Sequence, residues 1–237
     1  MSAIPKNVED IHPALWRGSQ LGRAAGAVVD TGYAALSEQL PGGGWPVSTL
    51  VELLVAQTGI GEIRLLRPAL IEVGKRPIAL VKPPQTPNAL GLAYLGIPLE
   101  QMLCVQPTST ADTLWSAEQI LRTGSCGAVL LWQQHIKQES LRRLLAAAQT
   151  STSIFFVVRP LASAQDASPA PLRLTLRPAT DGVEVEVIKR RGPAMDSPIN
   201  VQISPSPVLV SPRARPRTSP SPSLEPSIAI QQTPVSA

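Results

Sequence analysis

Apolar residues along this chain form short continuous runs, separated by segments in which they recur at helical spacing. The runs lie at 49–55, 77–82, 101–106, 127–132 and 153–159. Helical spacing occurs between them, at 60–74, 86–96, 109–124 and 139–149. Strands without polar positions are typical of a parallel sheet that is covered on both faces. The alternation therefore predicts an α/β fold, with a mostly parallel sheet and helices on both of its faces.

The pattern changes after residue 171. The segments LRLTLRP (172–178) and GVEVEVIKRR (182–191) alternate apolar with polar residues on either side of an ATDG turn. This alternation predicts an antiparallel hairpin with one face in water, placed at the end of the sheet. The segment before residue 40, which includes IHPALWRGSQLG, is interpreted as a short helix or arm that packs on the domain.

The last part of the chain differs in composition. Residues 193–237 contain ten prolines and nine serines, and the last aromatic residue of the chain is Phe156. Such a segment buries too little apolar surface to offset its ordering entropy, which predicts a disordered tail. The tail is a tether or partner-binding segment, for example through VLV at 208–210, or it has no specific role. The domain organisation expected is an arm (1–39), a core (40–192) and this tail.

Charge and cysteine content favour a cytosolic protein without narrowing its function. The net charge is +4 and the pI is near 9.4, which nucleic acid binding would tolerate but does not require. Cys104 and Cys126 have no metal-ligand spacing, so both are expected to be small core residues. We expect a soluble cytoplasmic protein, because the chain shows no signal peptide pattern and no apolar stretch of about 18 residues.

A glycine turn, AQTGIGEIR, follows the first apolar run and resembles the position of a phosphate-binding loop. Such a loop needs converging backbone N–H groups, a lysine for the phosphates and a Ser or Thr for magnesium. Here Gly61 and Glu62, which follow Gly59, stand where the lysine and the Ser or Thr are required. A carboxylate at a helix N-terminus is itself favoured by the helix dipole. Glu62 is therefore expected to occupy the place of an anionic ligand and to repel a phosphate.

The remaining parts of an ATPase site are missing from the sequence as well. The run 127–132 ends in Trp132 instead of an aspartate for magnesium, and PPQTPN (83–88) holds no carboxylate. His12 and His135 have no Cys, His or carboxylate at metal-ligand spacing. We expect no catalytic residues, metal or cofactor, and a degenerate site at Gly59, Gly61 and Glu62. A plain structural α/β core fits the same residues.

Several stretches, in order, are similar to one known family. HPALWRGSQL, LPGGGWPVSTLVELL, GIGEIRLLRPAL, LWSAEQILRTGSCGAVLLW, LRRLLAAAQTSTSIFFVVRP and LRLTLRP with VEVEVIKRRG resemble ImuA, over roughly residues 11–192. This resemblance implies a RecA-like core with a degraded nucleotide site. It also implies a non-catalytic accessory role in SOS-induced translesion DNA synthesis. The implied partners are an ImuB-type Y-family polymerase homologue, RecA and, indirectly, an error-prone replicative-type polymerase.

A second resemblance covers less of the chain. Residues 50–160 also look like SulA, the SOS-induced inhibitor of the division protein FtsZ, and ILRTGSCGAVLLW fits either family. LPGGGWP and the IKRRG strand belong to the ImuA pattern. A scaffold for a polymerase complex and a stoichiometric division inhibitor are therefore both carried forward.

Direct DNA binding is expected to be weak or indirect. The segment PLASAQDASPAP (160–171) lies where a recombinase grips single-stranded DNA, but it has no basic or aromatic residue. The densest basic group is IKRR, with Lys189, Arg190 and Arg191. These residues are either the solvated end of a hairpin strand or a candidate partner contact.

Overall fold

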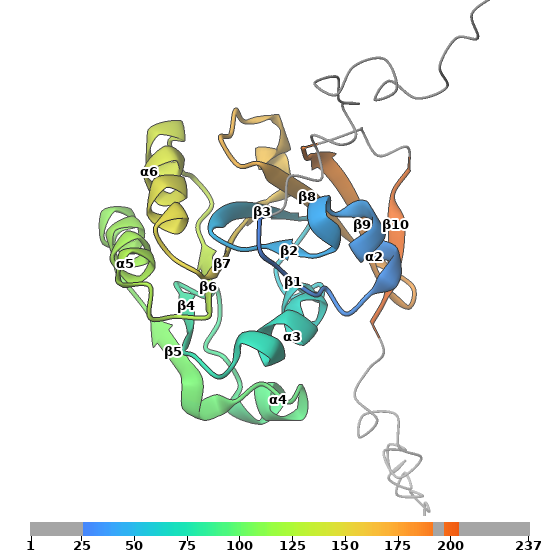
Figure 1. Ribbon diagram of the computed structural model, residues 1–237, viewed down its shortest axis with the longest axis horizontal. Helices are drawn as coiled ribbons and strands as arrows, with labels where there is room; N and C mark the ends of the chain where they lie inside the picture. The colour runs from blue at the N-terminus through green and yellow to red at the C-terminus, as the bar shows by residue number, and fades with distance from the viewer. Residues whose placement is uncertain (1–25, 192–196, 204–237) are drawn as a thin grey trace, which may run out of the picture. The chain divides into compact units, whose positions relative to one another are not determined.

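An eight-stranded mixed sheet organises the computed structural model, which describes residues 26–191 and 197–203 (Figure 1). The strand order is β10-β9-β8-β3-β7-β6-β4-β5. The strands are β3 (Thr49–Val55), β4 (Ile78–Val81), β5 (Met102–Val105), β6 (Ala128–Trp132), β7 (Ile154–Pro160), β8 (Leu172–Ala179), β9 (Gly182–Lys189) and β10 (Ile199–Gln202). All pairs from β8 to β5 are parallel, whereas β8–β9 and β9–β10 are antiparallel.

Helices cover both faces of this sheet, as the apolar runs predict. The helices are α2 (Ala34–Gln39), α3 (Glu62–Val73), α4 (Ala89–Tyr94), α5 (Thr110–Thr123) and α6 (Gln138–Gln149), with 3-10 turns η2 (Pro41–Gly43), η3 (Leu99–Gln101) and η4 (Leu161–Gln165). Two apolar clusters fill the two sides: α2, α3 and α4 contribute to one, and α5 and α6 to the other. The predicted fold class is confirmed. Across the described residues, no helix is long and apolar enough to cross a membrane.

Helix α5 begins and ends where its sequence signals place it. The Ser109 hydroxyl accepts a hydrogen bond from the Asp112 backbone N–H at 3.0 Å, which satisfies one of the free donors of the first turn. The helix ends at Gly124, whose φ of 64° is a left-handed conformation that glycine adopts without strain. Ala117 and Leu121 are fully buried against the sheet, as the helical spacing predicts.

The GGGW motif has a packing role. A Cβ at Gly44 would lie 2.5 Å from the carbonyl oxygen of Val29, so only glycine lets β1 (Val28–Val29) and β2 (Trp45–Pro46) approach. The next residue, Trp45, is fully buried and its ring meets that of Phe156 edge-on, with centroids 5.2 Å apart. The motif therefore anchors the segment before β3 in the core.

The hairpin is present at one end of the sheet, as predicted, but one expectation about it is wrong. Strand β8 pairs with β3, and β10 adds one further strand outside β9. One face was expected in water, yet the polar residues Arg173 and Thr175 of β8 are buried. Most of β8 is buried because the strand lies between two neighbours and η4 lies beside it, and only its end, at Arg177 and Pro178, is exposed.

Strand β10 also corrects the start of the predicted tail. Ile199–Gln202 pairs with β9, and Val201 is 3% exposed, so part of the segment from residue 193 belongs to the packed sheet. A four-residue strand between prolines gives too short an apolar pattern to predict. Residues 204–237, and residues 1–25 of the predicted arm, lie outside the described residues.

A buried ionic cluster joins the three central strands. The Glu52 carboxylate on β3 accepts hydrogen bonds from Arg159 Nη1 on β7 at 3.0 Å and from Arg173 Nε on β8 at 2.6 Å. The side chain of Glu52 is fully buried, and those of Arg159 and Arg173 are 2% and 8% exposed. Arg173 also donates to the carbonyls of Ser163 and Ala164 in η4, and Arg159 to the carboxylate of Asp166. We call these residues the Glu52 cluster.

Replacing Glu52 with Gln is expected to lower the free energy of unfolding by about 3 kcal/mol, because it leaves buried Arg173 without its counter-charge and Arg159 with Asp166 alone. Urea unfolding followed by circular dichroism measures the change. The matched control is Glu72→Gln, at an exposed position of α3 that makes no ion pair with any described residue. Equal midpoints for the two variants would show that the cluster contributes nothing.

Candidate functional site

The glycine turn lies at the carboxyl end of β3, where it leads into α3. Gly61 is the residue before the helix and has a φ of 126°, and a Cβ there would come within 3.4 Å of Val183. Gly59 has a φ of 83°. Both positions favour glycine because L side chains are strained in this region. The backbone conformation of the turn therefore requires glycine at both positions.

The Glu62 side chain fills this turn. Its carboxylate accepts hydrogen bonds from the Gly59 N–H, at 3.0 and 3.1 Å to its two oxygens, and from the Gly61 N–H at 3.2 Å. Glu62 is 4% exposed. N–H groups at the start of a helix commonly bind anions. Here they already bind the protein's own Glu62 carboxylate. The Glu62 carboxylate thus lies within the turn, and the expectation that it takes the place of an anionic ligand stays a prediction.

Two residues near the glycine turn, Trp132 and Arg64, are engaged in the fold as well. Trp132 ends β6 and is 7% exposed, and it belongs to the apolar cluster that Ile60 and Ile63 border. An indole therefore stands at the strand end where an ATPase would need an aspartate for magnesium. Arg64, the third residue of α3, is half-buried. Its carbonyl accepts a hydrogen bond from the Tyr33 hydroxyl at 3.2 Å.

Glu62→Ala is expected to lower the free energy of unfolding by about 1 kcal/mol, because the first turn of α3 loses its acceptor. The same variant is expected to gain more stability from sulfate than the wild type, because its freed N–H groups bind the anion. Thermal unfolding in matched sulfate and chloride solutions measures both effects.

Glu72→Ala serves as the control for general salt effects. The wild type is expected to show no heat of binding with magnesium-ATP in calorimetry. A sulfate response of Glu62→Ala equal to that of the control would contradict the assignment of this turn as an occupied anion site.

The three residues of the basic strand end do not form one cluster. Lys189 is exposed and its Nζ donates to the Ser168 carbonyl at 2.7 Å. Arg190 is half-buried and donates to the backbone carbonyl and side chain of Gln39 at the end of α2. Arg191 is exposed. Arg190 thus ties β9 to α2, while Lys189 and Arg191 present their charge to solvent; a contact with a partner stays a prediction.

The 160–171 segment is held against the sheet. Its η4 turn receives the two hydrogen bonds from Arg173, and Asp166 receives one from Arg159. The cations near this segment are therefore engaged with the protein's own carboxylate and carbonyl oxygens. The expectation of weak or indirect DNA binding, which rests on the lack of basic and aromatic residues within the segment, stays a prediction.

Two other expectations concern single residues. Cys126 is buried, as expected, but Cys104 is exposed on β5, so the expectation of two core cysteines is wrong for Cys104. Its strand is at the edge of the sheet, where no further strand covers it among the described residues. His135 is exposed in the loop between β6 and α6, and His12 lies outside the described residues. Over residues 26–191 and 197–203, no group of three His, Cys, Asp or Glu side chains is arranged for a metal.

Sequence reasoning missed an ionic cluster between α5 and α6. The Glu118 side chain is 9% exposed, and it accepts hydrogen bonds from Arg122 at 2.9 Å and from Arg143 at 2.5 Å. Burial raises the pKa of Glu118, but the hydrogen bonds from Arg143 and Arg122 outweigh it, and the pKa lies below its ordinary value. The four-residue spacing of Glu118 and Arg122 could have predicted their ion pair, because side chains four residues apart are neighbours on a helix. The pair with Arg143 had no signal in the sequence, because Arg143 is 25 residues from Glu118.

The lowered pKa of Glu118 determines how its contribution to the free energy of unfolding depends on pH. Because ionised Glu118 is favoured in the folded state, its stabilisation is present above the unfolded-state pKa and is lost as the pH falls through the folded-state pKa. Glu118→Gln is expected to cost of the order of 1 kcal/mol at neutral pH, since both guanidinium groups are largely in solvent. The difference from wild type should vanish in acid, as urea unfolding at a series of pH values would show. A difference that is constant with pH would indicate a packing effect instead.

The geometry defines an α/β protein whose phosphate-loop position is occupied by its own carboxylate. No protein-family model matches the chain. The chain is 30% identical over 99 residues to the cell division inhibitor SulA of Serratia marcescens, which covers 41% of this chain and 59% of that protein. It is 29% identical over 115 residues to SulA of Photorhabdus laumondii, which covers 48% of this chain and 65% of that protein. The chain thus spans about six tenths of the length of these curated relatives.

A solved structure is similar over a comparable share. The crystal structure of SulA from Pseudomonas aeruginosa has 24% sequence identity and a TM-score of 0.40, and the match covers 48% of this chain and 99% of that one. The similarity to the two curated SulA proteins agrees with the second resemblance seen in the sequence. The resemblance to ImuA remains an expectation from the sequence.

Proposed function

We propose that this chain is a non-catalytic protein of the bacterial DNA-damage response and that it acts by binding other proteins. The observation that carries the proposal is the Glu62 carboxylate, which holds the N–H groups of the glycine turn. A fold of the ATPase kind whose anion site is filled by its own carboxylate would not bind or hydrolyse a nucleotide there. Its surfaces would still be available to contact other proteins.

Inhibition of cell division is the process that the comparisons support better. Both curated relatives carry the name of cell division inhibitor, at 29–30% identity. By analogy, this chain would be induced in the SOS response and bind FtsZ stoichiometrically. The similarity covers less than half of this chain, so the remaining elements need a separate explanation under this candidate.

An accessory role in translesion DNA synthesis is the second candidate, and the extent of the ImuA resemblance favours it. That resemblance spans roughly residues 11–192, including the GGGW motif and the β8–β9 hairpin, both of which belong to the packed core. The chain would then serve as a scaffold for an ImuB-type Y-family homologue and RecA, with an error-prone replicative-type polymerase as an indirect partner. Lys189 and Arg191 are the exposed members of the candidate contact.

A strain that lacks the gene separates the two candidates after DNA damage. If the protein inhibits division, the deletion strain should continue dividing where its parent elongates, with an unchanged frequency of induced mutations. If it is a translesion accessory, the deletion strain should lose induced mutations and arrest division normally. Cell length and mutation frequency are measured in the same cultures. Deletion that changes neither would overturn the proposal.

A further inference from the structure

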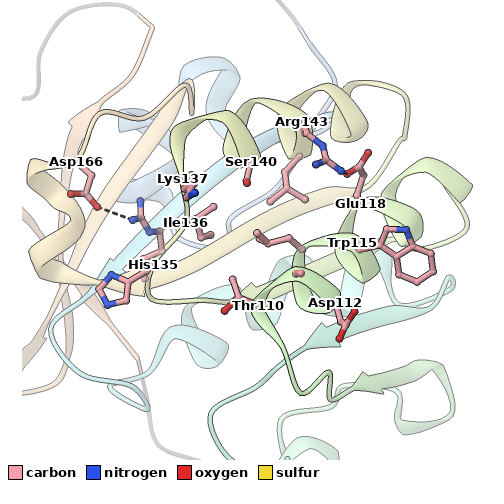
Figure 2. A pocket seen from close by; sticks show the side chains of 14 residues that line it. Thr110, Asp112, Trp115, Glu118, His135, Ile136, Lys137, Ser140, Arg143 and Asp166 are labelled. Carbon is pink, nitrogen blue, oxygen red and sulfur yellow. Dashed lines mark hydrogen bonds and ion pairs between the residues drawn. The ribbon is translucent and has the colours of Figure 1, made fainter.

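Two surface features are not used by the sites described above: a groove between α5 and α6, and the open edge of β5. The groove encloses about 820 Å³ (Figure 2). Three carboxylates and three cations line it: Asp112, Glu118 and Asp166, with Lys137, Arg143 and Arg159. Because these charges balance, the groove favours no single class of ligand. The edge of β5 is more selective, because free backbone groups in an extended strand are matched by another β-strand.

Strand β5 forms one margin of the sheet, and its outer edge is accessible. Its neighbour on the inner side is β4, and no described strand lies beyond it. Figure 1 shows β5 at the side of the sheet, between α4 and α5. Leu103 is 45% exposed, and Cys104 is exposed as well. A further strand can therefore reach the backbone of β5.

The pairing of β5 with β4 determines which backbone groups face outward. The two strands are parallel, with Val81 opposite Val105, and the Lys82 N–H donates to the Val105 carbonyl at 2.8 Å. In a parallel ladder, a residue that bonds to one neighbour turns both of its backbone groups toward it, and the next residue turns both away. Cys104 precedes Val105, so its N–H and carbonyl point to the open edge. Both are strong hydrogen-bonding groups that another strand would satisfy.

The β5 edge lacks the features that usually keep the edge of a sheet from pairing. Proteins protect such edges with lysines, prolines or bulges. Residues 102–105 are Met, Leu, Cys and Val, and their register with β4 has no shift. Between residues 83 and 117 the only charged residues are Glu100 and Asp112, and both lie outside the strand. Depletion of charge is characteristic of the centre of a protein interface.

Exposed apolar side chains lie on the elements that lead into β5. A strand of four residues is about 13 Å long, and by itself it buries far less than the roughly 800 Å² per partner of a typical stable interface. Four of the eight exposed large apolar side chains in the described residues lie between residues 90 and 103. They are Leu90 and Tyr94 on α4, Leu99 on η3, and Leu103 itself, and α4 contacts η3. The strand and these side chains, which we call the β5 surface, supply additional area.

A second copy of this chain carries the strand that the β5 surface requires. When two β5 strands pair antiparallel about a twofold axis, Cys104 of each copy donates to and accepts from the other copy. The strand has no charged residue, so no like charges meet within the pair. A twofold contact also covers both open edges at once, so assembly stops at the dimer. A strand from an unrelated chain would cover one edge only.

We propose that two copies of this chain form a twofold dimer by antiparallel pairing of their β5 strands. Leu90, Tyr94 and Leu99 pack at the flanks of the pair, and the two eight-stranded sheets join into one across the axis. The dimer goes beyond the proposed function and does not depend on it. It is measured on the purified protein, whereas the proposed function is measured in the deletion strain, so that either can fail without the other.

Sedimentation equilibrium of the full-length protein over a range of concentrations measures the dimer. The wild type should move from the 25.1 kDa monomer toward twice that mass as the concentration rises. Leu103→Lys places a lysine at the edge, and Cys104→Pro removes the outward N–H. A fold tolerates proline on an edge strand where the nitrogen faces solvent. Ile188→Lys is the matched control, because Ile188 is an exposed apolar residue of β9, at 37%.

Both edge variants are expected to raise the dissociation constant of the dimer by about tenfold or more, and Ile188→Lys by less than about threefold. Melting curves show whether each variant is folded, and Leu103→Lys decides the matter if Cys104→Pro is not. A wild type that stays monomeric at every concentration would overturn the proposal. A dimer that the edge variants leave unchanged would do the same, because another surface would then hold it.

Hydrogen exchange of single amides, followed by NMR, tests the pairing at the level of residues. The Cys104 N–H is expected to exchange more slowly as the dimer fraction rises, because it becomes hydrogen-bonded in the pair. The Val105 N–H faces β4 in the monomer and in the dimer, so its exchange should depend much less on concentration. An equal concentration dependence of the two amides would contradict pairing at this edge.

Discussion

The buried carboxylate of Glu52 is the constraint around which the middle of this molecule is built. An ionised group without water requires compensating partners, and Glu52 finds them on the strands at either side of its own. Through Arg173 it fixes the η4 turn, and through Arg159 it reaches Asp166. Charge compensation in the core thus determines the position of a surface segment that a simple apolar core would leave free.

The same principle operates at the glycine turn with a different outcome. The turn needs an anion because its N–H groups converge, and Glu62 supplies one from the neighbouring helix start. Its hydrogen bonds hold the turn as part of the folded core, and Trp132 belongs to the apolar cluster on which Ile60 and Ile63 pack.

The sequence predicted the parts of the structure that depend on local pattern. Continuous apolar runs identified the parallel strands, and helical spacing over 109–124 identified α5. The position of the Glu62 carboxylate at the start of α3 follows from helix-end electrostatics, which are local. The burial of Arg173 was missed, since its partner Glu52 is 121 residues away and only the sheet brings them together. Strand β10 was missed because its pairing with β9 depends on tertiary context.

The edge position of β5 has a chemical consequence. The two thiols of the chain differ in access: Cys104 is exposed on this strand, whereas Cys126 is buried, and burial raises the pKa of the Cys126 thiol. Thiolates are the reactive species in alkylation and disulfide exchange, so the native protein offers a maleimide one ready target and one protected group. The wild-type chain therefore carries a natural attachment point for a fluorophore or cross-linker at one margin of its sheet.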